Sequence, residues 1–229
     1  MDKISQLRQL LRRARGLIFD FDGLLADSER YHFLSYNEVF ARYGHVIDET
    51  EYYRYWTSLG LGVTGEIERH GLDLDPSAIR NEKMPIFTRY CEDGSIPIRD
   101  EAREMLETLS KTGKTMAIAS GSPSTDVRAV LRNAGVENLF DVILGSDLVP
   151  KIKPAPDLFL RTLEAFGLPA DECLVLEDAE KGMFAAITAG IPVIIIRTPE
   201  TKSADFGRAD LTVESHTEMI ELLKNALTI

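Results

Sequence analysis

Two aspartates, Asp20 and Asp22, stand one residue apart at the end of an apolar run in "GLIFDFDGLLADSE", residues 16–29. Where a strand continues past its end, residues i and i+2 point to the same side, so both carboxylates can face one reacting atom. Such a pair can divide its work, because one carboxylate can attack while the other transfers a proton. The alternative is that both are only turn residues.

Further polar residues follow other apolar runs. Ser120 and Gly121 follow one run, Lys153 lies in the loop after the next, and Glu177 and Asp178 end a third. In an open parallel sheet, ligands bind outside the carboxyl ends of the strands, so we expect these residues to converge with the aspartates. Ser122 and Pro123 are instead interpreted as the N-cap and first-turn residues of the next helix.

The converging acidic residues carry more charge than one lysine offsets. Two like charges about 4 Å apart repel by roughly 4 kcal/mol at an effective dielectric of about 20. A divalent cation can offset this, and an all-oxygen set of carboxylates, a backbone carbonyl and waters suits Mg²⁺ rather than zinc. A hydroxyl, amides at a helix start and a lysine suit a phosphoryl group.

The elements that must position these residues are strands that are apolar at every position, as in a parallel sheet covered on both faces. Helical patterns alternate with them from about residue 98 onward, and each of those patterns ends at a glycine. We therefore predict an α/β fold with a doubly wound, Rossmann-like parallel sheet. The expected strands are Leu17–Phe21, Thr115–Ser120, Asp141–Gly145, Cys173–Glu177 and Pro192–Ile196.

Residues 31–95 interrupt that alternation with successive helical patterns and no convincing strand. We predict a helical cap domain, residues 28–96, inserted after the first strand of a core domain formed by residues 1–27 and 97–229. The two crossings, near residues 26–29 and 96–100, can act as a hinge.

Composition limits the classes of partner. The 229 residues are 44% hydrophobic and 28% charged, as in an ordinary globular protein, and the formal net charge is −11. That charge argues against nucleic-acid and anionic-membrane binding, which need a basic face. The first 16 residues predict a short amphipathic helix of a cytoplasmic protein. Cys91 and Cys173 have no metal-ligand spacing and are expected to be reduced thiols.

Four stretches together resemble the motifs of the haloacid dehalogenase superfamily, and within it the β-phosphoglucomutase-like phosphatases: "FDFDGLLADSE", "ASGSP", "KPAPDLFL" and "LEDAEKGMFAAITAG". The resemblance covers essentially the whole chain, in order. It implies a HAD core and a Mg²⁺-dependent phosphatase for a small phosphorylated metabolite, similar to a sugar phosphate.

The resemblance also implies roles for the matching residues. Asp20 is the nucleophile that forms an aspartyl-phosphate, and Asp22 is the general acid and base. Asp20, the Asp22 carbonyl and Asp178 hold Mg²⁺, with Glu177 acting through water. Phosphate oxygens are held by Gly23, Ser120, Gly121 and Lys153, the last preferred over Lys151 because a proline follows it directly.

The helical segment gives divided evidence on substrate. "DSERYHF" resembles a mutase sequence in which the residue at the place of His32 positions the acid/base aspartate. The cap loop of β-phosphoglucomutase reads Lys-Gly-Val-Ser-Arg, whereas Leu61–Gly65 reads "LGVTG" and lacks both cationic residues. Arg54, Lys83 and Arg89 are interpreted as a solvated face, and His45 and His70 receive no role. In "IPIRDEA", residues 96–102, related proteins usually place a glycine after the proline, and Ile98 and Arg99 depart from this pattern.

Three alternatives stay open at this point. A β-phosphoglucomutase-like phosphosugar mutase would share the chemistry, but the absence of two cationic phosphate ligands disfavours it. A signalling switch with a phosphorylatable aspartate needs neither an Asp22-type acid nor a large helical insertion. A true dehalogenase would use the nucleophile without a metal, which the Asp22, Glu177 and Asp178 set disfavours.

Overall fold

The sheet is the frame of the molecule. The computed structural model describes residues 2–58, 60–202 and 204–227, and within them six parallel strands form one sheet in the order β3-β2-β1-β4-β5-β6. This confirms the predicted α/β class. The strands are β1 (Gly16–Phe19), β2 (Thr115–Ala119), β3 (Val142–Leu144), β4 (Cys173–Glu177), β5 (Val193–Ile196) and β6 (Leu211–Val213).

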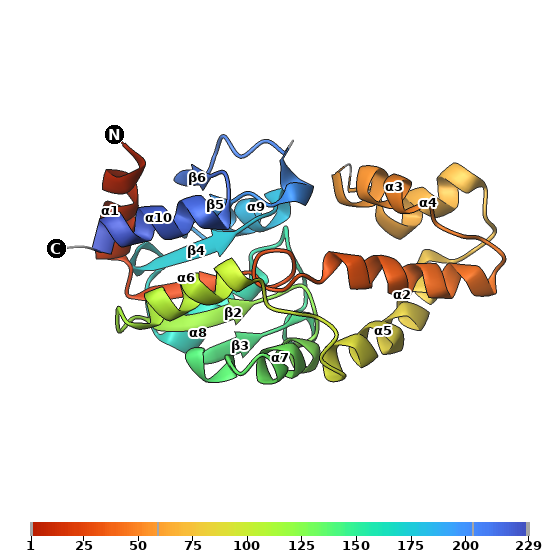
Figure 1. The fold of residues 1–229 in the computed structure, drawn as a ribbon, viewed down its shortest axis with the longest axis horizontal. Helices are drawn as coiled ribbons and strands as arrows, with labels where there is room; N and C mark the ends of the chain where they lie inside the picture. The colour runs from red at the N-terminus through yellow and green to blue at the C-terminus, as the bar shows by residue number, and fades with distance from the viewer. Residues whose placement is uncertain (1, 59, 203, 228–229) are drawn as a thin grey trace.

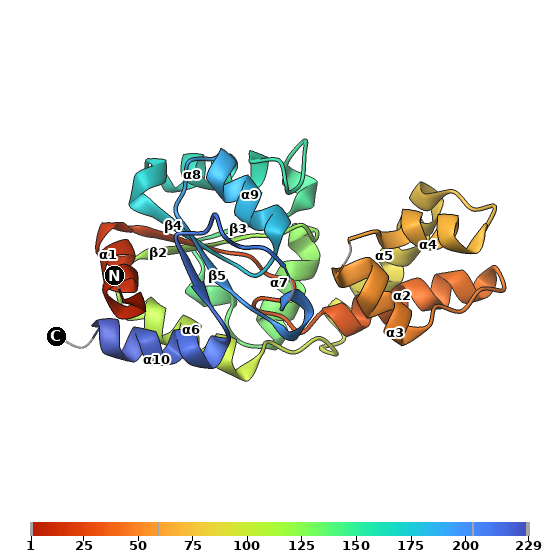
Figure 2. The same cartoon turned by 90° about the horizontal axis from the view of Figure 1, so that it is seen from above.

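The strands are mostly apolar because helices cover both faces of the sheet (Figures 1 and 2). On β1, Leu17 and Phe19 pack into one hydrophobic cluster while Ile18 packs into another on the opposite face. The first cluster includes residues of α1 (Lys3–Arg13), α6 (Asp100–Ser110), α7 (Ser124–Asn133) and α10 (His216–Leu227). The second includes residues of α8 (Asp157–Phe166) and α9 (Glu180–Thr188).

The five predicted strands are present, each within two residues of its predicted ends. The prediction did not include β6 or α10, which complete the edge of the sheet and its cover. β6 is only three residues long, and its middle residue, Thr212, is less buried than its neighbours. Such a short strand gives little periodic signal.

A separate group of helices lies beyond the carboxyl ends of the strands, at the right of Figures 1 and 2. We call residues 29–92 the helical segment. It has its own hydrophobic cluster, which includes Phe40, Trp56 and Ile79. Its elements are α2 (Glu29–Arg42), α3 (Glu49–Glu51), a π-helix over Tyr52–Ser58, α4 (Gly62–His70) and α5 (Pro76–Glu92).

The two connections between the sheet and the helical segment run side by side. Ala26 and Ile98 form an antiparallel bridge. Asp27 donates its amide to the Pro97 carbonyl at 2.9 Å, and Arg99 donates its amide to the Leu25 carbonyl at 2.9 Å. The boundary between the predicted domains therefore falls in a short two-stranded link.

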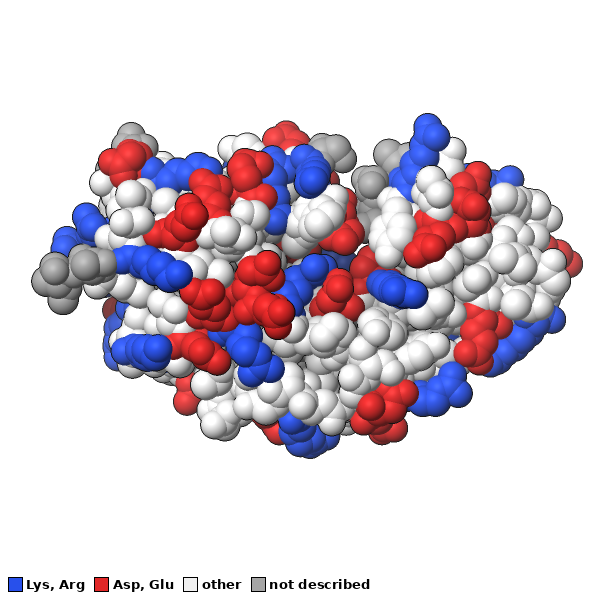
Figure 3. All heavy atoms as spheres, in the orientation of Figure 1, with Lys and Arg blue, Asp and Glu red and all other residues white. Residues whose placement is uncertain are grey.

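The surface carries charges of both signs. In Figure 3 acidic and basic side chains are interspersed over the visible face, with no extended basic area there. None of the helices in the described part of the chain is long and apolar enough to cross a lipid bilayer.

Candidate active site

A cleft of about 580 Å³ opens where the carboxyl ends of the strands meet the helical segment. Parallel strands bring their following residues to this one edge, so positions far apart in sequence converge here. The helical segment contributes Glu29, His32 and Trp56 to its wall. From the part of the chain that contains the sheet come Asp20, Asp22, Gly23, Gly121, Ser122, Lys153, Asp178, Lys181, Glu200 and Thr201, among others.

Asp20 shares a buried lysine with Glu177. The Asp20 amide donates to the Leu176 carbonyl at 3.0 Å and so continues the hydrogen bonding between β1 and β4. This bond fixes the backbone from which the Asp20 side chain projects. Lys153 Nζ lies 2.5 Å from Asp20 Oδ1 and 2.7 Å from Glu177 Oε1. Burial and the neighbouring Glu177 charge raise the pKa of Asp20 to about 7. Burial disfavours the charge on Lys153, but Asp20 and Glu177 together keep its pKa above the ordinary value.

Glu177 is fixed by the turn that precedes α9. Its Oε2 accepts hydrogen bonds from the amides of Asp178 and Ala179, both at 2.9 Å. Gly182, in the first turn of α9, leaves the space that this carboxylate fills, because a Cβ there would lie 1.6 Å from Glu177 Oε1. Any other residue at 182 would displace Glu177 and, with it, the partner of Lys153.

Three carboxylates, Asp20, Glu177 and Asp178, each place an oxygen within 4.8 Å of the others. Burial and the charges of Glu177 and Asp20 raise the pKa of Asp178 well above its usual range. This crowding of buried negative charge is what a divalent cation offsets, and an oxygen-only donor set fits Mg²⁺. Gly23, at φ +84°, lets the Asp178 carboxylate lie close to the backbone, since a Cβ at position 23 would lie 2.6 Å from Asp178 Oδ2.

Asp22 is held in a different environment, by hydroxyl groups. Ser28 Oγ donates to its Oδ1 at 2.8 Å, while Ser120 Oγ at 3.1 Å and Ser122 Oγ at 2.7 Å donate to its Oδ2. Burial disfavours the Asp22 charge, but contacts with His32 and with the Ser122 and Ser28 hydroxyl groups outweigh burial and hold its pKa well below the ordinary value.

His32 links Asp22 to the interior of the helical segment. Its Nε2 lies 3.5 Å from Asp22 Oδ1, and its Nδ1 lies 2.8 Å from Lys83 Nζ. A charged lysine can only donate, so Nδ1 is the acceptor and Nε2 carries the proton that faces Asp22. Burial and the Lys83 charge lower the pKa of His32, which favours this neutral form. The ring stacks on Phe87 with centroids 4.0 Å apart, which fixes its plane.

Comparison with known proteins identifies the family. Residues 17–196 match the family model described as haloacid dehalogenase-like hydrolase. This chain belongs to that family. It is 31% identical to the protein CbbY of Rhodobacter capsulatus over 86% of this chain and 91% of the relative. It is 31% identical to the fructose-1-phosphate phosphatase YqaB of Escherichia coli, over 82% of this chain and 99% of the relative.

A solved structure also matches this chain. It is a CbbY variant from Rhodobacter sphaeroides in complex with xylulose-1,5-bisphosphate, with a TM-score of 0.75 and 27% identity, covering 90% of this chain and 96% of that one. The sequence comparison and the structural comparison therefore both match this chain to CbbY proteins.

The family motifs predicted most of the cleft, and the structure shows where each residue lies. Asp20, Asp22, Gly121, Lys153 and Asp178 line it together. Ser120 and Glu177 are fully buried behind that lining, where Ser120 contacts Asp22 and Glu177 contacts Lys153. The Gly23 amide donates to the Ala26 carbonyl at 3.0 Å, so Gly23 forms a sharp turn beside the cleft, while its contact with phosphate stays a prediction.

Two interpretations of single residues were wrong. Lys83 is not on a solvated face: it is only 5% exposed and contacts His32 and the Phe87 ring. Ser122 is not a helix N-cap, because α7 starts at Ser124 and the Asp147 carboxylate accepts the Ser124 amide at 2.6 Å. Arg54, Arg89 and Lys151 are exposed, as a solvated position requires.

Proposed function

We propose that this hydrolase is a Mg²⁺-dependent phosphatase that transfers the phosphoryl group of a small phosphorylated sugar to Asp20 and then to water. One observation carries the proposal: the buried Asp20 carboxylate lies against Lys153 in the same cleft as Asp22. A carboxylate that attacks phosphorus needs a nearby cation and a separate proton donor, and both are within reach here.

In the first step an Asp20 oxygen attacks phosphorus and the bond from phosphorus to the sugar oxygen breaks. Asp22 gives its proton to the leaving oxygen, so the sugar departs as an alcohol. The approach of an anionic phosphate raises the pKa of Asp22, since like charge disfavours ionisation, and so supplies the protonated form. The His32 Nε2–H then steadies the carboxylate that remains.

In the second step Asp22 accepts a proton from water, whose oxygen attacks phosphorus and releases the Asp20 carboxylate and inorganic phosphate. Lys153 offsets the charge on the phosphoryl oxygens and on Asp20 through both steps. Asp20, Asp178 and the Asp22 carbonyl are the groups we assign to Mg²⁺, with Glu177 acting through water. When bound, the cation supplies charge neutralisation for the phosphoryl oxygens.

We assign the helical segment the role of a cap that selects the substrate. The cleft is of the size that small metabolites occupy. Fructose-1-phosphate and xylulose-1,5-bisphosphate, the compounds in the names of two similar proteins, both carry a phosphate on the carbon beside a ketone. A ketose 1-phosphate is therefore the first substrate class to test. Glu29, Glu200 and Thr201 on the cleft wall can bind its hydroxyl groups.

A phosphosugar mutase is the second candidate, favoured by the contact between His32 and Asp22. A mutase must retain a second phosphate group, and this requires cations at the positions that match Leu61–Gly65. Here the matching positions are Leu61, directly before α4, and Gly65, within α4, where a Cβ would lie 2.4 Å from the Leu61 Cβ, so neither position supplies a cation. This observation favours the phosphatase.

The deciding experiment incubates the purified protein with ketose and aldose phosphates, with Mg²⁺ or with a chelator, and measures both inorganic phosphate and isomerised sugar phosphate. Asp20→Asn and Asp22→Asn are the test variants, and Asp171→Asn, on an exposed side chain, is the control. We expect Mg²⁺-dependent phosphate release that both test variants lose. Turnover in the chelator, or full activity of Asp20→Asn, would refute the mechanism. Isomer without phosphate release would favour the mutase.

A further inference from the structure

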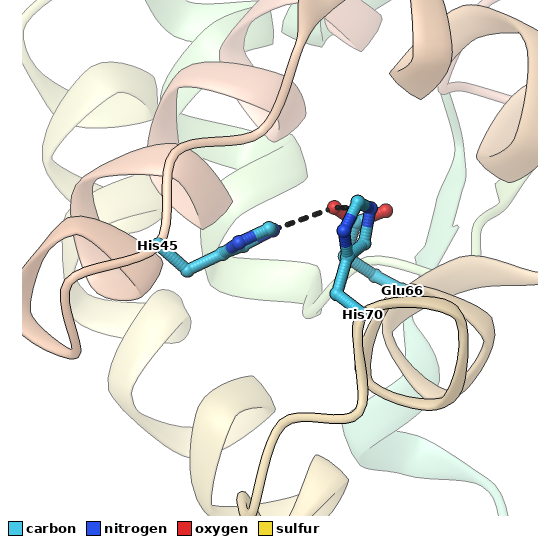
Figure 4. A group of neighbouring side chains, drawn as sticks. All are labelled: His45, Glu66 and His70. Carbon is cyan, nitrogen blue, oxygen red and sulfur yellow. Dashed lines mark hydrogen bonds and ion pairs between the residues drawn. The ribbon is translucent and has the colours of Figure 1, made fainter.

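A second cluster of metal-ligating side chains lies in the helical segment. His45 follows α2 in the chain, whereas Glu66 and His70 are one turn apart on α4 and so share a face of that helix. His45 Nε2 lies 2.8 Å from Glu66 Oε1, and His70 Nε2 lies 3.4 Å from the same oxygen. Figure 4 shows the two imidazole rings turned toward this carboxylate.

We propose that His45 Nε2, Glu66 Oε1 and His70 Nε2 bind a first-row divalent cation of the Zn²⁺ type. The three atoms lie within 4.8 Å of one another. Ligands about 2.0 to 2.1 Å from a tetrahedral zinc ion are separated by about 3.3 Å, so small side-chain movements suffice to admit the ion. Two imidazoles and one carboxylate form a donor set that zinc sites use with water in the open position.

The charge of the cluster favours a cation. Glu66 is only 1% exposed, and Glu51 Oε2 lies 3.6 Å from His70 Nε2, at the edge of the cluster. Arg69 is the opposing charge, 2.7 Å from Glu51 and 3.2 Å from Glu66 Oε2. With both histidines neutral, two carboxylates and one guanidinium leave a net negative charge beside the proposed ion.

The Glu66 carboxylate is oriented before any ion arrives. Its Oε2 accepts the Trp56 indole N–H at 3.0 Å and contacts Arg69, which leaves Oε1 directed at the histidines. Outer partners that fix a ligand in this way strengthen metal sites. Entry is open from the His70 side, since the His70 side chain is 34% exposed and that of His45 14%.

The donor atoms separate this cluster from the catalytic one. The core cluster of Asp20, Glu177 and Asp178 offers only oxygens and suits Mg²⁺. The cluster of His45, Glu66 and His70 offers two imidazole nitrogens, which favour zinc, cobalt or nickel. The two are connected through Trp56, which binds Glu66 and lines the catalytic cleft. An ion on Glu66 therefore fixes one wall of the substrate cleft and ties α4 to the end of α2.

The test uses the chain of residues 1–229 without a histidine tag, stripped of metal and then supplied with excess Mg²⁺ to fill the site formed by Asp20, Glu177 and Asp178. Zn²⁺ binding is measured by calorimetry, and Co²⁺ binding by visible absorption, which is stronger for four- and five-coordinate ions than for octahedral ones. His45→Gln and His70→Gln are the test variants. Glu68→Gln, an exposed carboxylate on α4, and Asp178→Asn in the core cluster are the controls.

We expect one Zn²⁺ per chain in the wild type and in both controls, and affinity lower by about 100-fold or more in each histidine variant. Circular dichroism and thermal unfolding of the metal-free proteins check that the variants fold, which single changes at these partly exposed histidines should permit. Three results would overturn the proposal: no Zn²⁺ binding by the wild type in excess Mg²⁺, equal binding by the histidine variants, or loss of binding in Asp178→Asn.

Discussion

Two lysines buried on either side of the cleft, Lys153 and Lys83, have opposite electrostatic properties. Each is nearly excluded from solvent, at 6% and 5% exposure. Lys153 lies between the Asp20 and Glu177 carboxylates, which raise its pKa despite burial. Lys83 faces the His32 ring nitrogen and the Phe87 ring, and burial lowers its pKa to about 8.

Because the two lysines are buried to a similar extent, their partners account for the difference: the carboxylates beside Lys153 outweigh burial, whereas at Lys83 burial prevails. Lys153 is a permanent cation, suited to offsetting a phosphoryl group through a whole reaction. Lys83 titrates near neutrality and reaches the reacting groups only through His32, whose proton faces Asp22. The sheet thus provides constant charge, while the helical segment provides an adjustable hydrogen bond to Asp22, the proposed acid and base.

Lys153→Met should produce the largest effect of any change in this comparison. Removing one partner of a buried ion pair costs about 3 to 5 kcal/mol because the other charges stay buried without compensation. Asp20 and Glu177 would lose their shared cation, and phosphatase activity should fall by about a thousandfold or more. Urea unfolding at several pH values measures the stability.

The loss of stability in Lys153→Met should shrink at acid pH, where Asp20, whose pKa is raised to about 7, takes up a proton. A variant as stable as the wild type at neutral pH would show that Lys153 does not compensate these carboxylates. Lys151→Met, on an exposed side chain near Lys153 in the same loop, is the matched control and should change neither property.

Lys83→Met should have a smaller and pH-dependent effect. Without the ammonium donor the His32 tautomer is no longer fixed, and we expect kcat to fall by about 10- to 100-fold. In the wild type, kcat should decline as pH rises through about 8, where Lys83 loses its charge. The variant should lack that decline, and an identical pH profile in both proteins would contradict the role given to Lys83.

Stability supplies an independent check on Lys83. Its pKa is lowered from 10.5 in the unfolded chain to about 8 in the folded protein. Between these values the unfolded chain binds more protons, so the free energy of unfolding should rise with pH, by up to about 3 kcal/mol relative to Lys83→Met. Chemical unfolding at pH 8 and above measures this slope.

The same contrast explains what could be predicted from the sequence. Four site residues follow apolar strands directly or lie in the loops after them, and parallel strands must bring such positions together. They are Asp20, Asp22, Lys153 and Asp178. Lys83 carries no such local sign. Its burial depends on packing α5 against α2, which places it beside His32, 51 residues earlier in the chain.

Ser122 could not be placed correctly because its local sequence fits two structures. A serine before a proline is typical of a helix start. In the fold, Asp147 from the loop after β3 takes the capping role at Ser124, and Ser122 is left to contact Asp22. Gly182 likewise reads as an ordinary helix residue until Glu177 is seen to occupy the space above it.

Ser122→Ala tests whether the Asp22 carboxylate is tuned by its hydroxyl donors. A hydrogen bond to a charged group contributes about 1.5 to 3 kcal/mol, so losing the 2.7 Å bond should raise the pKa of Asp22 by about one to two pH units. We expect kcat to fall by about tenfold and the acid limb of the pH profile to move to higher pH. Steady-state kinetics across pH measures both.

Ser124→Ala is the matched control for Ser122→Ala. Its hydroxyl donates to Asp147 at 2.7 Å rather than to Asp22. Its removal should lower stability by about 1 kcal/mol through the helix start, with no change in the pH profile. If both serine variants shift the profile equally, the effect belongs to the loop and not to the contact with Asp22.

Arg99→Ala should give the smallest effect, at the link between the two regions. Arg99 Nε donates to the Gly23 carbonyl at 2.9 Å, and its Nη2 lies 2.9 Å from Asp27 Oδ1. One side chain thus joins the turn that follows Asp20 to both connecting strands. We expect the free energy of unfolding to fall by about 1 to 2 kcal/mol, with faster amide exchange over residues 25–29 and 96–99.

Arg103→Ala separates a local loss from a loosened link, because Arg103 also donates to a backbone carbonyl, that of Ala134, but away from the crossings. If only Arg99→Ala speeds exchange in the connecting strands, the Arg99 side chain stiffens the link. Equal exchange in both variants would mean that the backbone bonds of Asp27 and Arg99 alone hold the link. The adjustable contact from His32 to Asp22 would then depend on packing within the helical segment and not on its attachment to the sheet.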